Sequence, residues 1–336
     1  MTISSLKKQD KSNIESFCKD IIAHKLPDLS LSSAQSFVSK AYLSGMIKNT
    51  NINQLSYWFN NIFLPNHFSL DYDDYCEAAI QALFMCPKVA STDYGTSRER
   101  DFGQKWTDTI RGYLGEIAIR KFFFSKFGLK IELGHDEGTL EEYKYTDIHQ
   151  VKLKNENEYR QPRLDISIKS IKCNGLWLDI PGDQLNHSDI FIVASLGIET
   201  NHLFSFFKKL SVFELLMDQN ERLKLLDNKE IQKLVNHFPS FKQIIGYVPG
   251  FQLKAETQRK PNFEYDGQKG KEIYTIRSFS GFLAKDFKDK IKDEENAKDV
   301  KFEGIGNFSS NDKYIFGIGF LKNSLNDWNK FVLDKI

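Results

Sequence analysis

The stretch Leu164-Asp-Ile-Ser-Ile-Lys-Ser-Ile-Lys172 alternates apolar and polar residues, which predicts a β-strand. The even-numbered residues up to Ile168 are apolar and share one face, which we expect to be core. Asp165, Ser167 and Lys169 share the opposite face. A half-exposed strand with a solvated polar face has the same alternation. If the strand is instead buried, the acid and the lysine need charged partners or a metal, because desolvating an isolated charge is costly.

Acidic residues precede this strand in two predicted elements. Helical spacing of apolar residues predicts a helix over 107–127, ended by Gly128. Glu116 lies beside the apolar stripe of that helix. Asp147 lies in the strand-like segment 145–153, and a polar stretch of hairpin length, 155–163, joins it to the 164–171 strand. Two antiparallel strands joined there would bring Asp147 beside Lys169.

The rest of the chain predicts a mixed α/β (α+β) fold. Amphipathic stretches indicate a helical N-terminal subdomain over 1–90, followed by a core over 91–248 and a C-terminal α+β portion over 249–336. The additional strands are expected at 129–133, 176–180, 189–196, 272–277 and 314–321. The 189–196 strand is almost entirely apolar and should be central. Helices are expected at 212–218 and 229–236, a solvated helix at 284–299, and turns at 249–250 and 266–267.

The order of these acidic and basic residues resembles the PD-(D/E)xK nuclease superfamily, whose best-known members are type II restriction endonucleases. The resemblance consists of Gly115-Glu116 in a helix, Asp147 on one strand, and an acid followed by Lys169 on the next. It continues through Asn174-Gly-Leu-Trp-Leu-Asp-Ile-Pro181, Gln184, His187-Ser-Asp189 and Ile190-Phe-Ile-Val193, and it covers residues 98–196. The resemblance implies a restriction-endonuclease-like mixed sheet flanked by helices.

One position departs from the family pattern. The family usually carries Asp or Glu two residues before the lysine, and here that position is Ser167. The resemblance implies that another carboxylate replaces it. Asp165, on the same strand face, and Asp183, in the turn after the next strand, are the candidates, and we favour Asp165. Same-face neighbours on a strand are about 6.6 Å apart, so Asp165 would need some adjustment to reach a shared metal.

The resemblance also implies Mg²⁺-dependent phosphodiester hydrolysis. Carboxylates suit Mg²⁺, which prefers oxygen ligands, and the metal would polarise the phosphate and acidify a bound water. Asp147 is expected to be the main metal ligand, Glu116 the second and Asp165 the third. Lys169 would lie near the attacking water and the phosphate. Clustered carboxylates should keep its ammonium charged, which favours electrostatic stabilisation over general-base catalysis.

Basic residues around this segment indicate a surface that faces DNA. Between Val151 and Lys172, six basic residues stand against three acidic ones. Arg98, Arg100, Lys172 and Asn174 are candidate DNA contacts, together with Ser170, although exposed loop chemistry explains them equally well. Such groups neutralise phosphates but do not read sequence. The 252–262 stretch, which contains Gln252 and Lys254, is a candidate for target reading, but its composition favours a polar loop.

Bulk composition limits the other functional classes. The 46 basic and 45 acidic residues give a net charge of +1, which excludes a globally basic chromatin-like protein. The four cysteines form no CxxC pair, which argues against zinc knuckles and disulfide frameworks. The N-terminal 30 residues lack an apolar signal segment, and no apolar run approaches the ~20 residues of a membrane helix. A cytoplasmic protein without a membrane partner is expected. P-loop, HExxH and GxSxG motifs are absent.

The resemblance therefore implies a sequence-specific endonuclease of a restriction system that cuts double-stranded DNA. Cutting both strands of a palindrome implies a homodimer, and a restriction system implies a cognate DNA methyltransferase. Two alternatives remain open. Ser167 motivates a DNA-binding protein on the same fold without catalysis. An interaction protein without any nucleic-acid role is the other.

Overall fold

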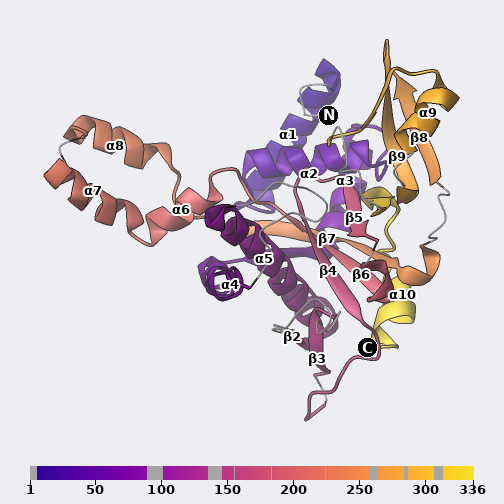
Figure 1. Cartoon of the computed structure of the whole chain (residues 1–336), viewed down its shortest axis with the longest axis horizontal. Coiled ribbons are helices and arrows are strands. Elements are labelled where there is room, and N and C mark those ends of the chain that lie inside the picture. Colours follow the sequence, from indigo (N-terminus) through magenta and orange to yellow (C-terminus); the bar gives the residue numbers. More distant parts are fainter. Residues whose placement is uncertain are drawn as a thin grey trace.

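A computed structural model describes residues 6–88, 101–134, 146–154, 156–182, 184–223, 225–257, 263–283, 287–305 and 313–336. Helices and strands alternate along the described chain, and the strands form three sheets, which confirms the mixed α/β class (Figure 1). Among the described residues, no helix is both long and apolar enough to cross a membrane.

The central sheet has four strands in the order β1-β7-β6-β4. They are β1 (His67–Leu70), β7 (Ile244–Leu253), β6 (Ile190–Leu196) and β4 (Ile166–Lys172). β4 runs parallel to β6, and β7 runs antiparallel to both β6 and β1. Every residue of β6 is buried, so the prediction of a central strand at 189–196 is confirmed.

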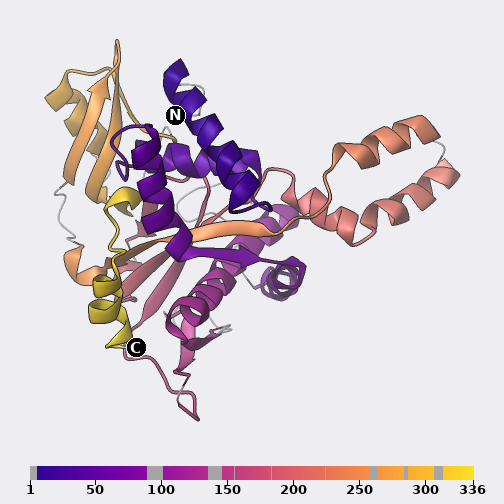
Figure 2. The same cartoon turned by 180° about the vertical axis from the view of Figure 1, so that it is seen from behind.

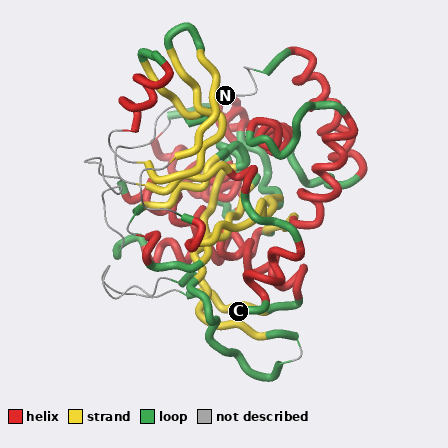
Figure 3. Tube along the Cα trace, turned by 90° about the vertical axis from the view of Figure 1, so that its right-hand side faces the viewer, coloured by secondary structure: helices red, strands yellow, loops and turns green. Residues whose placement is uncertain are grey.

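A second sheet has five strands. Its order is β10-β9-β11-β5, and β8 pairs with β9 outside this path. Its strands are β5 (Trp177–Pro181), β8 (Phe263–Lys269), β9 (Ile273–Leu283), β10 (Asp299–Phe302) and β11 (Lys313–Gly317). The β8–β9 ribbon stands out from the body (Figure 3). A third, two-stranded sheet pairs β2 (Lys130–Leu133) with β3 (Ile148–Lys152).

The long helix α5 (Phe102–Phe127) packs against the central sheet. It begins where the Asp101 side chain accepts a hydrogen bond from the Gln104 N–H, and it ends at Gly128, whose φ of 67° is left-handed. Its apolar stripe joins the core formed by the inward face of β4. α4 (Tyr72–Met85) lies beside it, held by two hydrogen bonds of 2.7 and 2.6 Å from Arg120 to Glu77.

The N-terminal helices form a core of their own that closes onto the central sheet. They are α1 (Lys8–His24), α2 (Leu31–Leu43) and α3 (Ile52–Trp58), followed by a π-helical turn over Phe59–Phe63 and a 3-10 turn over Leu64–Asn66. Their buried aromatic residues pack on Ile245 and Tyr247 of β7. The helical prediction for 1–90 is confirmed in kind, but β1 within it belongs to the sheet.

Three helices project from the body between β6 and β7. They are α6 (His202–Lys209), α7 (Val212–Leu223) and α8 (Asn228–His237), and together they form an arm (Figures 1 and 2). Near the C-terminus, α9 (Phe287–Glu295) is largely solvated but buries Phe287 and Ile291. The chain ends with α10 (Leu325–Trp328) and a π-helical turn over Asn329–Leu333.

Two predicted turns are instead irregularities inside strands. Pro249–Gly250 lies within β7, where the register against β6 shifts between Val193 and Ser195. Asp266–Gly267 lies within β8 at a similar shift. Glycine and proline mark both β-bulges and turns, so local composition did not separate the two. The boundary expected at 248/249 consequently falls inside a strand.

Replacing Gly250 with alanine should destabilise the fold. Gly250 has a φ of 144°, and an added Cβ would lie 2.3 Å from the Lys322 carbonyl oxygen. We expect Gly250→Ala to lower the free energy of unfolding by about 2 kcal/mol or more in urea titrations. Gly45→Ala is the matched control, because Gly45 has a φ of 80° but open space around it. Equal losses for the two variants would show that the close approach at Gly250 is unimportant.

Candidate active site

Asp147 is anchored against the outer edge of β4. Its N–H donates to the Ile166 carbonyl at 2.8 Å, and its Oδ2 accepts from the Ile168 N–H. Thr146 Oγ1 accepts from the Ile166 N–H at 3.2 Å. These bonds fix the Asp147 carboxylate beside the β4 backbone, although segment 145–153 and β4 form no regular antiparallel ladder within the described residues.

Glu116 reaches the same edge from α5. A Cβ atom added to Gly115 would lie only 3.0 Å from the Cβ of Ser170 and would collide with that side chain. Only glycine therefore permits this contact between α5 and β4. The Ser170 hydroxyl also donates to the Gly112 carbonyl at 3.3 Å. Glu116 follows directly, and within the described residues its buried Oε2 has no hydrogen-bond partner. An unpaired buried carboxylate oxygen is an available ligand atom.

Burial and neighbouring charges perturb the protonation of both carboxyl groups. Burial raises the pKa of Glu116 well above its ordinary value, and the nearby Asp147 carboxylate raises it further, while Lys169 opposes both. Burial also raises the pKa of Asp147, and Lys169, the Ile168 N–H and the Ser167 hydroxyl counteract that rise. Two adjacent carboxylates whose ionised forms are disfavoured in the free protein accommodate a cation well.

Lys169 supplies the positive charge of this cluster. The pKa of Lys169 lies below its ordinary value, because burial lowers it more than Asp147, Asp179 and Glu116 raise it. Its ammonium donates to Gln184 Oε1 at 2.7 Å. Glu116, Asp147 and Lys169 are each only partly buried, so the cluster remains open to solvent. The structure therefore brings these three predicted residues together, with the Ser167 hydroxyl beside them.

Asp179 of β5 is a member of the cluster that the sequence interpretation missed. Its Oδ2 accepts from Lys313 at 2.8 Å, and its buried Oδ1 has no hydrogen-bond partner among the described residues. β5 belongs to the second sheet, through its pairing with β11. The signal was a single acid in the apolar strand Trp-Leu-Asp-Ile-Pro, the same kind of signal that selected β4.

Asp165 lies apart from the cluster. Its N–H donates to Asp189 Oδ2 at 3.1 Å, and its pKa is raised by burial and by Asp189 and lowered by Lys254. This position corrects the choice of Asp165 as the replacement carboxylate. Asp165 precedes β4 and pairs with the start of β6, whereas Asp147 and Lys169 meet further along β4.

The remaining candidates are distributed as follows. Lys172 lies at the exposed end of β4, and Asn174 lies in the turn before β5. Gln252 is buried in β7, where its side chain reaches the Leu253 carbonyl at 3.4 Å. Arg98, Arg100, Asp183 and the 258–262 part of the proposed recognition stretch lie outside the described residues.

Within the described residues, the cluster fits a magnesium ion only together with further ligands such as waters or substrate oxygens. The described residues contain no group of three or more His, Cys, Asp and Glu side chains arranged to hold a metal. Mg²⁺, however, is usually bound through one or two carboxylates together with waters and substrate phosphate oxygens. Glu116, with its unpaired Oε2, and Asp147 form such a pair.

Comparisons with protein-family models, with curated proteins and with solved structures found no match to this chain.

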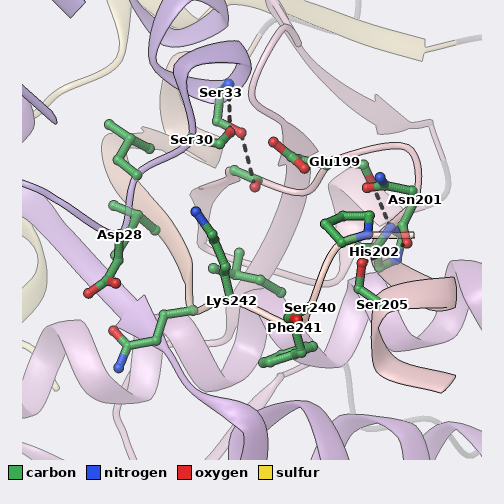
Figure 4. A pocket seen from close by; sticks show the side chains of 16 residues that line it. Asp28, Ser30, Ser33, Glu199, Asn201, His202, Ser205, Ser240, Phe241 and Lys242 are labelled. Atoms are coloured by element: carbon green, nitrogen blue, oxygen red, sulfur yellow. Dashed lines mark hydrogen bonds between the residues drawn. The ribbon is translucent and has the colours of Figure 1, made fainter. Parts of the chain in front are cut away.

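A cavity of about 160 Å³ lies elsewhere, at the base of the arm. Asp28, His202 and Lys242 are among the residues that line it (Figure 4). It contains none of the predicted catalytic residues. The chemistry-bearing cluster and this cavity are therefore separate features.

Replacing Glu116 with glutamine should stabilise the protein at neutral pH. The folded-state pKa of Glu116 is raised, so its ionised form destabilises the fold above its ordinary pKa of 4.5, and the penalty disappears below that pH. We expect Glu116→Gln to add about 0.5–2 kcal/mol to the free energy of unfolding at pH 7 and little at pH 4. Glu132→Gln, on the exposed side of β2, is the control. A pH-independent effect would argue against a buried charge at Glu116.

Proposed function

We propose that this chain is a Mg²⁺-dependent, sequence-specific endonuclease that hydrolyses phosphodiester bonds of double-stranded DNA. The observation that carries the proposal is the convergence of Glu116, Asp147 and Lys169 from α5, the segment before β3, and β4. Two carboxylates and a lysine at the edge of a mixed sheet are what the resemblance to PD-(D/E)xK nucleases implies. A restriction-endonuclease-like core is part of the proposal.

In this mechanism, Asp147 and Glu116 hold the metal, and Asp147 is kept in place by the β4 backbone. Mg²⁺, when bound, supplies charge neutralisation at the scissile phosphate and a more acidic water. The Ser167 hydroxyl lies beside Asp147 and favours its ionised form. Asp165 takes no part in this proposal, because its N–H donates to Asp189 at the start of β6 and the charges that act on its carboxyl group are those of Asp189 and Lys254.

We assign Lys169 the role of the positive charge in this site. Burial, the largest effect, lowers its pKa, three carboxylates oppose that lowering, and its ammonium donates to Gln184. A charged ammonium cannot accept a proton, so its role is to stabilise negative charge that develops on the phosphate and to position the attacking water. Asp179 supports this charge without contacting the substrate, which makes it a positioning residue.

The biological setting is proposed on the same basis. One cluster per chain cuts one strand, so cutting both strands requires a homodimer on the two-fold axis of its DNA site. A restriction system would pair the enzyme with a cognate DNA methyltransferase and place it in the cytoplasm. DNA binding without cleavage is the second candidate. It is favoured by Ser167 in the family's acid position.

Cleavage should depend on Asp147 and Lys169 but not on Asp165. We expect Asp147→Asn and Lys169→Met to reduce the rate of phage DNA cleavage with Mg²⁺ by at least about 100-fold, because each removes charge stabilisation at the reacting phosphate. Asp165→Asn is the matched control and should cut at a rate close to wild type. Circular dichroism checks that all three fold. Wild-type protein that binds DNA but never cuts it would favour the second candidate.

Replacing Asp179 with asparagine should shift the pH dependence of cleavage. Asp179 raises the pKa of Lys169, so Asp179→Asn should lower that pKa. If the charged ammonium is the active form, the loss of activity on the alkaline side should begin at a lower pH than in wild type. Rate–pH profiles of the variant, of wild type and of Asp165→Asn measure this. An unchanged alkaline limb with a merely lower rate would indicate a structural role for Asp179.

A further inference from the structure

A pocket of about 250 Å³ lies next to the cluster, on the side of Lys169 that faces the C-terminal end of β4. α5 contributes Asp108, Arg111 and Gly112 to its lining. β4 contributes residues 168–172, and the chain leaving β6 contributes Leu196 and Ile198. Lys169 is common to the lining of this pocket and to the acidic cluster, so the two features are adjacent along β4.

The side chains that line the pocket are mainly cationic, in contrast to the acidic cluster. Arg111, Lys169 and Lys172 line it, and Asp108 is its one carboxylate among the described lining residues. Asp108 forms an ion pair with Arg111 and orients the guanidinium from within the same helix. The pKa of His202, near the pocket, is lowered mainly by burial. Arg111 and Lys172 lower it further, while the hydrogen bond with the Glu199 carbonyl opposes the lowering.

Gly112 has no structural reason to be glycine. Glycine is the least favourable residue inside a helix apart from proline. Gly115, one turn later, is required because a Cβ there would collide with Ser170, but a Cβ on Gly112 would have nothing within 4 Å. Gly112 lines the pocket, so the missing side chain leaves room for a ligand to approach the helix backbone closely.

We propose that this pocket binds a phosphate of the DNA backbone. This phosphate neighbours, along the same strand, the phosphate that is cleaved at the Glu116–Asp147–Lys169 cluster. Arg111 and Lys172 contact the phosphate, and the strand backbone passes over Gly112. Arginine presents a planar fork of donors that matches phosphate oxygens. The apolar wall formed by Leu196 and Ile198 suits the sugar that follows. The inference rests on the proposed function, because it names the substrate position next to that site.

The test is the salt dependence of binding to a mixed-sequence DNA duplex without added metal, which needs neither cleavage nor a known target site. Removing one phosphate-binding side chain should reduce the slope of log K against log salt by about 0.9. We expect Arg111→Gln to show this reduction and to bind about 10- to 100-fold more weakly at low salt. Lys19→Gln, on the exposed face of α1, is the matched control and should behave as wild type.

A second variant tests the pocket without removing a charge. Gly112→Leu should fill the pocket and weaken binding to a similar extent, while its melting temperature stays equal to or above that of wild type, because leucine favours the helix. Unchanged slopes and affinities in both variants would overturn the phosphate subsite even if the protein cuts DNA. Reduced slopes in a protein that never cuts DNA would support the subsite and overturn the nuclease proposal. A wild-type protein that does not bind DNA would overturn both.

Discussion

The contact of Gly115 with Ser170 is the constraint on which the site depends. A helix normally keeps its distance from a sheet because side chains fill the space between them. At this point one side chain is missing, and α5 reaches the backbone of β4 closely enough for Ser170 to bond the Gly112 carbonyl. The next residue along the helix is Glu116, which therefore reaches the strand edge where Asp147 is bound. A bulkier residue at position 115 would push α5 away from β4 and would therefore also move the Glu116 carboxylate away from Asp147.

The cluster concentrates charge where burial opposes it. Burial disfavours the ionised forms of Glu116 and Asp147, and Asp147 adds to the penalty on Glu116. Burial also lowers the pKa of Lys169, and three acids oppose that lowering. No member is stable in isolation, because an uncompensated buried charge is more costly than a paired one. Such arrangements occur mainly where binding or catalysis requires them. The unpaired oxygens of Glu116 and Asp179 indicate that the compensation is incomplete within the described part of the free protein.

The sequence predicted helices and strands correctly where the spacing of apolar residues alone identifies them. The β4 and β6 strands and the α5 helix with its Gly128 stop all follow from spacing and caps. The contacts between residues that are distant in the sequence could not be predicted in the same way. Asp179 joins the site because β5 pairs with β11, a strand far along the chain, and nothing local indicates that pairing. Asp165 lies apart from the site because its backbone is bound at the start of β6, where its N–H donates to Asp189 Oδ2. Pro249 and Gly250 have turn composition, yet the register shift against β6 absorbs them within β7.

The arm has a different relation to the fold. β6 and β7 are antiparallel neighbours, and Leu196 pairs with Gly246, so the chain departs and returns at one place. The entropic cost of a longer excursion grows only slowly with its length. The start of the 197–243 segment is fixed to the body, because Ile198 and Phe206 are buried in the main core. The length of the arm beyond α6 could therefore change without changing the pairing of β6 with β7. Its point of attachment lies at Leu196 and Ile198, so the helices of this appendage are tethered directly to the rim of the cationic pocket.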